Sequence, residues 1–247
     1  MDDNTPKDEE LISIGEAAKI LGVHIVTLRR WDEAGRLRAV RKSPGGTRYY
    51  SQRDLDVFSG NLFRLAFDWA ANHSQSEIPN TFYCSNSSIF QARLIKMQDV
   101  LAQNANIQDI FSLVTAVVGE IGNNSFDHNL GKWPDVSGIF FAYDIQRREI
   151  VLADRGVGIL ETLKRVKPAL TNHEEALRTA FTEILSGRSP ESRGNGLKFV
   201  REVVADSLMS LVFQSGNAEV SIEKSSSELN LKRTKNTIRG CIAVIKY

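Results

Sequence analysis

The chain has 247 residues, of which 42% are hydrophobic and 25% charged, and its formal net charge is +1. This composition is typical of a globular protein with one large or two modest domains. A net charge so close to zero excludes a global attraction to polyanions. The two cysteines, Cys84 and Cys241, form no disulfide framework or metal cluster and favour a reducing compartment.

Neither a secretory signal nor a membrane-spanning segment is expected. Residues 1–10 are polar and acidic, unlike a signal peptide, and we expect them to be a disordered tail. No apolar run reaches the roughly 18 residues that a membrane helix requires. We therefore expect a soluble cytoplasmic protein that does not contact membranes.

Two short helices joined by a tight glycine turn are predicted where the folded chain begins. Ser13 and Glu16 predict a capping box at the start of the first helix, and Gly22 predicts its end. A second helix is expected from about residue 25 to residue 34, with Gly35 as its stop. This pattern predicts a helix-turn-helix.

The next residues predict a wing and a strong local positive charge. Residues 43–50 contain a Gly-Gly pair and predict a β-hairpin, and a further helix opens near Asp54. Residues 29–53 include eight basic and two acidic residues, which is a local net charge of +6. Such a concentration in a nearly neutral protein is typical of nucleic-acid binders, and the alternative is a solvated charged face.

Residues 11–58 resemble the winged helix-turn-helix of the MerR family. The resemblance is carried by residues 14–18, 21–23, 27–31 and 46–50. It implies double-stranded DNA as the partner.

The same resemblance implies which residues contact DNA. Thr27, Arg29 and Arg30 would enter or flank the major groove, where one of the two arginines would read a guanine edge. Arg48, beside Tyr49 in the wing, would contact phosphate, which positions the protein without reading sequence.

Residues 59–80 predict a connecting helix followed by a linker. The helix is apolar on more than one side, and it would either connect two domains or pair two protomers. MerR-type proteins usually dimerise, so a homodimer is expected, although no sustained heptad pattern is present.

A strand at 81–84 and a helix at 90–103 are expected next, and then a longer amphipathic helix. The apolar stripe of that helix consists of Ile110, Leu113, Val114, Val117 and Ile121. Glu120, Asn124 and His128 recur every four residues and share one face of it. That face is either a solvated edge or a carboxylate base beside an amide oxygen suited to Mg²⁺. Asn123 is an alternative ligand, about 100° round the helix.

Two strands, at 138–145 and 149–153, predict a hairpin that leads into a glycine motif. Asp154 follows the second strand, and Gly156 and Gly158 follow Asp154. Such a carboxylate can accept a hydrogen bond from the exocyclic amine of adenine, and glycine lets a ligand approach the backbone. The motif by itself is weak, because turns use the same residues.

Residues 160–193 predict a lid between this motif and a second glycine stretch. Arg193 would either meet a γ-phosphate or be an exposed loop residue. Gly194 and Gly196 precede a helical pattern that begins at Leu197, which suits phosphate bound at a helix N-terminus.

The last predicted strands lie at 209–213, 219–223 and 241–245, with a flexible excursion at 225–237. The expected fold class is therefore α+β. An N-terminal winged helix-turn-helix precedes an α/β sandwich, in which helices cover one face of a mostly antiparallel mixed sheet.

The order and spacing of the three polar stretches in residues 90–247 resemble the ATP-binding domain of the GHKL superfamily, which has the Bergerat fold. The spacing is closest to that of the anti-sigma-factor serine kinases, and the domain is expected to span 81–247. The resemblance implies ATP and Mg²⁺ as cofactors. Glu120 then looks like the general base, Asn124 like the Mg²⁺ ligand and Asp154 like the residue that recognises the adenine amine.

The remaining ATP-binding residues follow from the same resemblance. Gly156 and Gly158 would lie against the purine, and the phosphates would be wrapped by Arg193, Gly194, Gly196 and Leu197. One departure is Gly240-Cys241, where the family often has Gly-Thr, so that a threonine hydroxyl is missing near the expected adenine.

The sequence favours a DNA-bound regulator that responds to ATP. No P-loop motif, dinucleotide fingerprint or zinc-ligand cluster is present in the sequence. The alternative is a serine/threonine protein kinase that acts on a small STAS-type partner, and a third reading is a DNA-binding protein whose ATP fold is inert. Whether the protein is an enzyme stays open, with Glu120 as the candidate base for a slow ATPase or a kinase.

Overall fold

The computed structural model of the chain describes residues 11–41, 43, 45–71, 78–184 and 196–247. The chain divides into two compact units, one ending at Leu65 and the other beginning at Ala66. The division falls inside α4 (Leu62–Ala71), within residues 59–80, which were expected to connect the two domains as a helix and a linker. None of the described helices combines the length and the apolar character that crossing a membrane requires.

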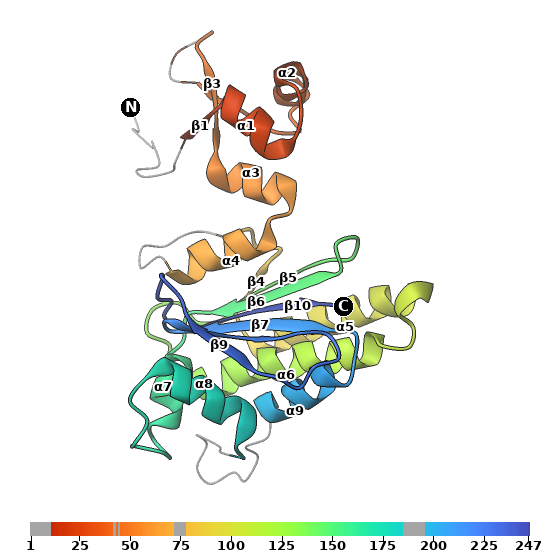
Figure 1. Ribbon diagram of the computed structural model, residues 1–247. Coiled ribbons are helices and arrows are strands. Elements are labelled where there is room, and N and C mark those ends of the chain that lie inside the picture. Colours follow the sequence, from red (N-terminus) through yellow and green to blue (C-terminus); the bar gives the residue numbers. More distant parts are fainter. Residues whose placement is uncertain (1–10, 42, 44, 72–77, 185–195) are drawn as a thin grey trace. The chain divides into compact units, whose positions relative to one another are not determined.

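The described residues of the first unit up to Ser59 form three helices and a three-stranded sheet. In chain order its elements are β1 (Leu11–Ser13), α1 (Ile14–Leu21), α2 (Ile25–Glu33), β2 (Val40–Arg41), β3 (Arg48–Ser51) and α3 (Gln52–Ser59) (Figure 1). The strands pair antiparallel in the order β1-β3-β2, so β2 and β3 form the expected wing. Strand β1 was not expected, because three residues are too few to show an alternating pattern.

Local signals explain where the helices of this unit begin and end. The capping box between Ser13 and Glu16 is confirmed, and Gly22 ends α1 with a φ of 64°. The core consists of buried residues of the three helices and β3, and the hydroxyl of Tyr50 donates to the carbonyl of Leu28 at 3.2 Å. The turn between α1 and α2 is therefore fixed by a cap on one side and by core packing on the other.

The second unit is an α/β sandwich built on a seven-stranded sheet. Its elements are β4 (Tyr83–Cys84), α5 (Ser87–Ala102), α6 (Phe111–Asn129), β5 (Ile139–Asp144), β6 (Glu149–Asp154), α7 (Gly158–Leu163), α8 (His173–Thr182), α9 (Gly196–Ala205), β7 (Ser210–Ser215), β8 (Ala218–Ile222), β9 (Asn230–Arg233) and β10 (Cys241–Lys246). The strand order is β4-β5-β6-β10-β7-β8-β9.

Every pair of neighbouring strands in this sheet is antiparallel, so the mixed sheet expected from the sequence is wrong. The helical connection from β6 to β7 carries the chain across the sheet and gives the two strands the same direction. β10 lies between them and runs opposite to both. Because β10 lies between them, β6 and β7 do not pair with each other as parallel strands.

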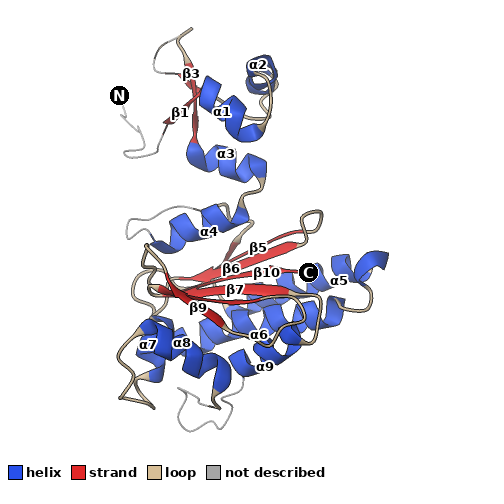
Figure 2. Ribbon diagram, in the orientation of Figure 1, coloured by secondary structure: helices blue, strands red, loops and turns tan. Residues whose placement is uncertain are grey.

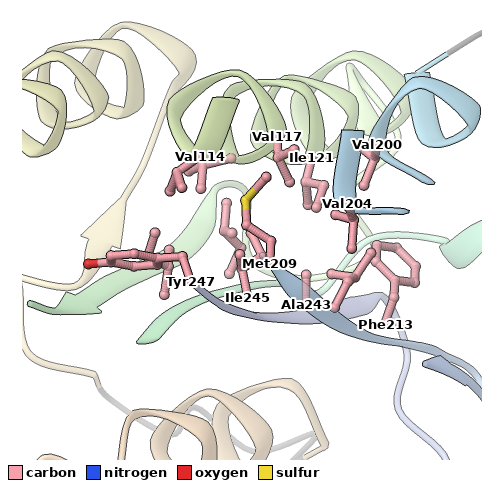
Figure 3. Packing of buried hydrophobic residues seen from close by; sticks show 14 of the residues in the cluster. Val114, Val117, Ile121, Val200, Val204, Met209, Phe213, Ala243, Ile245 and Tyr247 are labelled. Atoms are coloured by element: carbon pink, nitrogen blue, oxygen red, sulfur yellow. The ribbon is translucent and has the colours of Figure 1, made fainter. Parts of the chain in front are cut away.

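Helices cover one face of the sheet, as Figure 2 shows for α5, α6, α8 and α9. Figure 3 shows Val114, Val117 and Ile121 of α6 above strand residues such as Ile245. Leu113 was expected in the same stripe but is 39% exposed. Its position is about 100° from Val114 round the helix, which turns it away from the sheet.

The opposite face of the sheet is covered as well, which the sequence analysis did not foresee. Ile150, Val151, Leu152 and Ala153 of β6 are consecutive and all buried, and alternate residues of a strand face opposite sides. The C-terminal part of α4 contacts this unit, because the Trp69 ring lies 6.4 Å from the Tyr83 ring. The helix expected to connect the domains therefore belongs in part to the second unit.

Two expected loops contain regular structure. The excursion predicted at 225–237 holds β9, which pairs with β8 at the sheet edge. It escaped the sequence analysis because edge strands are often polar. The predicted lid at 160–193 holds the end of α7 and all of α8, and Leu160, Leu163, Leu170 and Ala176 form a small core there. Only residues 185–193 of that lid lie outside the described residues.

We predict that Gly122→Ala destabilises the second unit. A Cβ at Gly122 would lie 2.1 Å from Cζ of the buried Phe90 ring, and overpacking of this kind costs roughly 1–3 kcal/mol. Gly119→Ala on the same helix is the control, since its Cβ would meet only Cδ2 of Leu94, at 3.2 Å. Thermal unfolding should show a lower Tm for Gly122→Ala than for Gly119→Ala, and equal Tm values would contradict the packing of α5 on α6.

Candidate functional site

The outward face of α2 carries the arginines that are expected to meet DNA. Arg29 and Arg30 are exposed, Thr27 is partly exposed, and Leu28 between them is buried in the core. Neither arginine has an ion-pair partner in the part of the chain that the structure describes. Their charge is therefore available at the surface, while the neighbouring leucine anchors the helix.

Arg48 of the wing, with Tyr49 partly exposed beside it, is bonded within the unit to Asp32 of α2. Its Nε lies 2.7 Å from Oδ2 of Asp32, and Arg41 contacts the same oxygen. The N–H of Ala39 donates to Oδ1 at 2.9 Å. Burial acts to raise the pKa of Asp32, but the hydrogen bonds from Ala39 and Arg48 and the charges of Arg41 and Arg48 together lower it. Asp32 thus ties the wing to α2.

In the second unit, the start of α9 lies against two polar side chains of α6. A Cβ at Gly196 would lie 2.1 Å from Oε1 of Glu120 and 2.7 Å from Nδ2 of Asn124, so a larger residue there would displace these two side chains. Asn124 also donates to Glu120, with 3.2 Å between Nδ2 and Oε1. Leu197, the next residue of α9, packs against the main core. Glu120, Asn124 and Gly196 are therefore brought together, as the sequence predicted.

Asp154 lies beside this cluster at the end of β6, and it is only 2% exposed. Its Oδ1 accepts a hydrogen bond from the N–H of Gly156 at 2.8 Å, and its Oδ2 accepts one from the hydroxyl of Ser125 at 2.9 Å. Burial raises the pKa of Asp154 to about 6, although these two bonds and the N–H of Cys241 oppose the rise. Because Ser125 follows Asn124 on α6, its bond joins Asp154 to the helix that carries Glu120.

Glycines allow the backbone to approach this carboxylate closely. A Cβ at Gly156 would lie 2.1 Å from Nδ2 of Asn129, and one at Gly240 would lie 2.2 Å from the backbone oxygen of Asp154. Gly158 has a φ of +76°, which side chains with a Cβ rarely adopt. Gly158 is thus required by the backbone of the loop after β6, and Gly240 by the close approach of the residue before β10 to the Asp154 backbone.

Cys241 lies next to Asp154, because β10 pairs with β6 and Ile242 is opposite Ala153. Burial raises the pKa of its thiol well above the ordinary value, with a further contribution from Asp154, so the thiol is neutral at physiological pH. The hydroxyl of Ser215 on β7 lies 3.6 Å from the Cys241 sulfur. A hydroxyl from a neighbouring strand is therefore present beside the position where the resemblance led us to expect a threonine.

Some residues singled out from the sequence lie elsewhere. Arg193 and Gly194 lie outside the described residues. Asn123, the alternative metal ligand, is turned towards α5, where its Oδ1 accepts from Nε2 of Gln91 at 2.6 Å. It is therefore removed from the face that carries Glu120 and Asn124. His128 lies on α6 and is partly buried.

Glu120 and Asn124 of α6 are the residues of this cluster that could contribute oxygen atoms to a metal ion. The described residues contain no group of three or more His, Cys, Asp or Glu side chains that could hold a metal ion. Mg²⁺ is usually bound through one or two protein oxygens together with waters and substrate phosphates. The Glu120–Asn124 pair next to a glycine at a helix N-terminus matches such a shared site.

Several residues of these two sites were missed by the sequence analysis. Asp32 was counted only as an opposing charge, and Ser125, Asn129 and Ser215 were not considered. Ser125 could have been found from the sequence, since it directly follows Asn124. The other three act through partners that are distant in the sequence, so no local pattern marks them.

Comparison with known proteins identifies the first site. The family model described as "MerR family regulatory protein" matches residues 13–50, and these residues are a MerR-family helix-turn-helix domain. This match indicates a MerR-type DNA-binding regulator. The chain is also similar to the Type II methyltransferase M.Eco47II of Escherichia coli, with 36% identity over 75 residues. The similar segment covers 30% of this chain and 17% of the methyltransferase, so the chain spans only a small part of that relative.

We predict that Arg48→Ala weakens binding to all DNA sequences alike and lowers the slope of log affinity against log salt by about one. The same variant should lower the Tm of the first unit, because Asp32 loses one of its cations. Arg38→Ala is the control, since Arg38 is exposed and makes no contact with Asp32 among the described residues. Fluorescence anisotropy against salt measures the slope. A sequence-selective loss of affinity would instead assign Arg48 to base reading.

We predict that the effect of Asp154→Asn on the free energy of unfolding of the second unit depends on pH. Compared with wild type at the same pH, the variant should be more stable at pH 7 than at pH 5. The folded pKa of about 6 lies above the ordinary 3.8, so the folded state holds the proton more tightly than the unfolded state does. Protonation of Asp154 therefore stabilises the folded wild type at low pH. The free energy of unfolding of the wild type falls by about 1 kcal/mol between pH 5 and pH 7. Denaturant unfolding of both proteins at the two pH values measures this difference. A difference independent of pH would contradict the raised pKa.

Proposed function

We propose that the protein is a DNA-binding regulator whose second unit binds Mg-ATP, and that nucleotide occupancy controls its engagement with DNA or with a partner. The MerR-family domain supplies contact with double-stranded DNA. The proposal for ATP rests on the second unit alone. Methyl transfer is not part of it, because the similarity to the methyltransferase covers so little of that protein.

One observation carries the proposal for ATP, namely the meeting of three sequence stretches around α6. Gly196 lies against Glu120 and Asn124, and the next residue of α6, Ser125, bonds to Asp154. These groups come from segments that are about 30 to 75 residues apart in the sequence, and chance proximity of three expected motifs is a weak explanation. The raised pKa of Asp154 adds support, because buried ionisable groups with perturbed pKa values cluster at functional sites.

In this proposal the protein groups divide the work of binding. Asp154 accepts a hydrogen bond from the exocyclic amine of adenine, using the lone pairs that Gly156 and Ser125 leave on its two oxygens. Gly156 and Gly158 leave room for the purine beside the backbone. Gly196 and Leu197 face the phosphates at the start of α9. Arg193 and Gly194, which the resemblance assigns to the same phosphates, lie outside the described residues. Asn124 holds Mg²⁺ through its amide oxygen, since its nitrogen is bonded to Glu120.

The same arrangement permits turnover with Glu120 as base. Mg²⁺, when bound, offsets the charge that develops on the phosphates. Glu120 would take a proton from water in an ATPase, or from a serine or threonine hydroxyl in a protein kinase. The kinase, with a STAS-type protein as its partner, is the alternative function, and the spacing of Glu120, Asn124 and His128 along one face of α6 favours it over a gyrase- or MutL-like ATPase. A homodimer and a cytoplasmic location complete the proposal.

We predict that Glu120→Ala binds ATP with nearly the wild-type affinity but no longer turns it over. Asp154→Asn should lose at least about tenfold in affinity, because an amide presents a donor where adenine needs a charged acceptor. Calorimetry measures binding, and γ-labelled ATP measures turnover, with the full chain alone and with the products of neighbouring genes.

The labelled products separate the candidate functions. Free phosphate indicates an ATPase, and label on a serine or threonine of a partner indicates a kinase. Unchanged affinity in Asp154→Asn would contradict the adenine contact, and retained turnover in Glu120→Ala would remove Glu120 as the base. If the wild-type protein binds no nucleotide, the proposal fails and only the DNA-binding domain stands.

A further inference from the structure

The residue that follows Asp154 is a buried arginine, Arg155, which is bonded to Trp69 and Asp135. Arg155 is 2% exposed, and its Nη1 donates to the backbone oxygen of Trp69 in α4 at 2.9 Å. Its Cζ lies 5.8 Å from the centre of the Trp69 ring. A charged side chain of this kind is almost never buried unless it is fully paired.

The pairing partner is Asp135, in the segment between α6 and β5. Nε and Nη2 of Arg155 lie 3.3 Å and 2.5 Å from the two oxygens of Asp135, which is the two-pronged geometry that suits a guanidinium. Arg239 donates to Oδ2 of the same carboxylate at 3.0 Å. Burial acts to raise the pKa of Asp135, but the hydrogen bonds from Arg155 and from the N–H of Val136, together with the charges of Arg155 and Arg239, lower it.

These contacts come from residues next to the ends of two strands. Arg155 directly follows Asp154, where β6 ends, and Arg239 precedes Gly240, at which a Cβ would lie 2.2 Å from the backbone oxygen of Asp154. Asp135 is bonded to both arginines and so joins the two segments beside Asp154. A ligand held by the carboxylate of Asp154 and the glycines after it would fix the backbone from which the Arg155 side chain extends.

The contacts of Arg155 also involve α4, a helix that spans the division between the two units. It begins at Leu62 in the first unit and ends at Ala71 in the second, with the division between Leu65 and Ala66. Arg155 contacts it through both the backbone oxygen and the ring of Trp69. The part of α4 that belongs to the second unit is therefore bonded to the residue next to the proposed adenine contact.

We infer that Arg155 is a positioning residue that transmits nucleotide occupancy from the proposed site at Asp154 to α4, and through this helix to the MerR-type domain. The inference rests on the proposed function and names how that site is regulated. A ligand shifts a conformational equilibrium only by its differential affinity for the two states. Here the two states differ in how the guanidinium, held by Asp135, engages the carbonyl of Trp69.

The test variant is Arg155→Lys in the full chain. Lysine keeps a positive charge beside Asp135, but it lacks the planar fork that reaches Asp135 and the Trp69 carbonyl together. Two quantities are measured with and without Mg-ATP: hydrogen exchange of the peptide that covers residues 66–71, and affinity for a labelled duplex selected by the wild-type protein from a random-sequence pool. Nucleotide affinity is measured in parallel by calorimetry.

In the wild type, Mg-ATP should change hydrogen exchange in α4 and change DNA affinity by about fivefold or more. In Arg155→Lys both responses should be lost while nucleotide affinity stays near the wild-type value. Arg239→Gln is the matched control, because it removes the other cation on Asp135 without touching Trp69 and should keep both responses. If Arg155→Lys fails to fold, Asp135→Asn is the second test variant, because it weakens the pairing that holds the Arg155 guanidinium. It should also lose the effects of Mg-ATP on hydrogen exchange in α4 and on DNA affinity.

The outcomes separate the inference from the function on which it rests. If the wild type binds no nucleotide, both fall. If it binds nucleotide but α4 exchange does not change, or if Arg155→Lys responds like wild type, the inference alone is overturned. Equal loss in Arg155→Lys and Arg239→Gln also overturns it, because the effect would then belong to Asp135 as a general structural support.

Discussion

The buried carboxyl group of Asp154 determines how the second unit is arranged around α6. Its two oxygens accept bonds from Gly156 and Ser125, so the end of β6, the loop after it and the middle of α6 are held together at one point. Burying a carboxylate is costly unless donors surround it, and here the donors only partly offset the cost, as the raised pKa of Asp154 shows. A carboxyl group whose burial is only partly compensated is better explained by ligand binding than by structural stabilisation.

Close approach of the backbone is the second constraint on this site. Gly156, Gly196 and Gly240 come from three distant parts of the chain, and at each of them a Cβ would fall within 2.2 Å of another atom. Gly240 reaches Asp154 because β10 is inserted between β6 and β7. The strand order therefore places Gly240 beside the carboxylate.

A carboxylate also organises the first unit, with a different consequence. Asp32 accepts bonds from Ala39, Arg41 and Arg48 and holds the wing against α2. Part of the local positive charge is thus used to hold the unit together. Arg29 and Arg30 remain as the exposed charges of α2, which makes this helix the better candidate for reading bases. The charge count by itself overstates what the unit offers to DNA.

The sequence by itself determined the elements whose signals are local. The capping box at Ser13, the positive φ of Gly22 and the apolar spacing of α6 act over a few residues, so the helix-turn-helix and the placement of Glu120 and Asn124 on one helix could be predicted. Asp154 at a strand end was predictable for the same reason. The MerR resemblance was confirmed over residues 13–50 because it consists of such local signals.

Only the tertiary structure decided what depends on partners far along the chain. The position of β10 between β6 and β7, the pairing of Arg48 with Asp32 and the bond from Ser125 to Asp154 each join segments separated by 16 or more residues. The link from Arg155 to Trp69 spans 86 residues. Such contacts follow from how elements pack after they have formed, and packing leaves no periodic mark in the sequence.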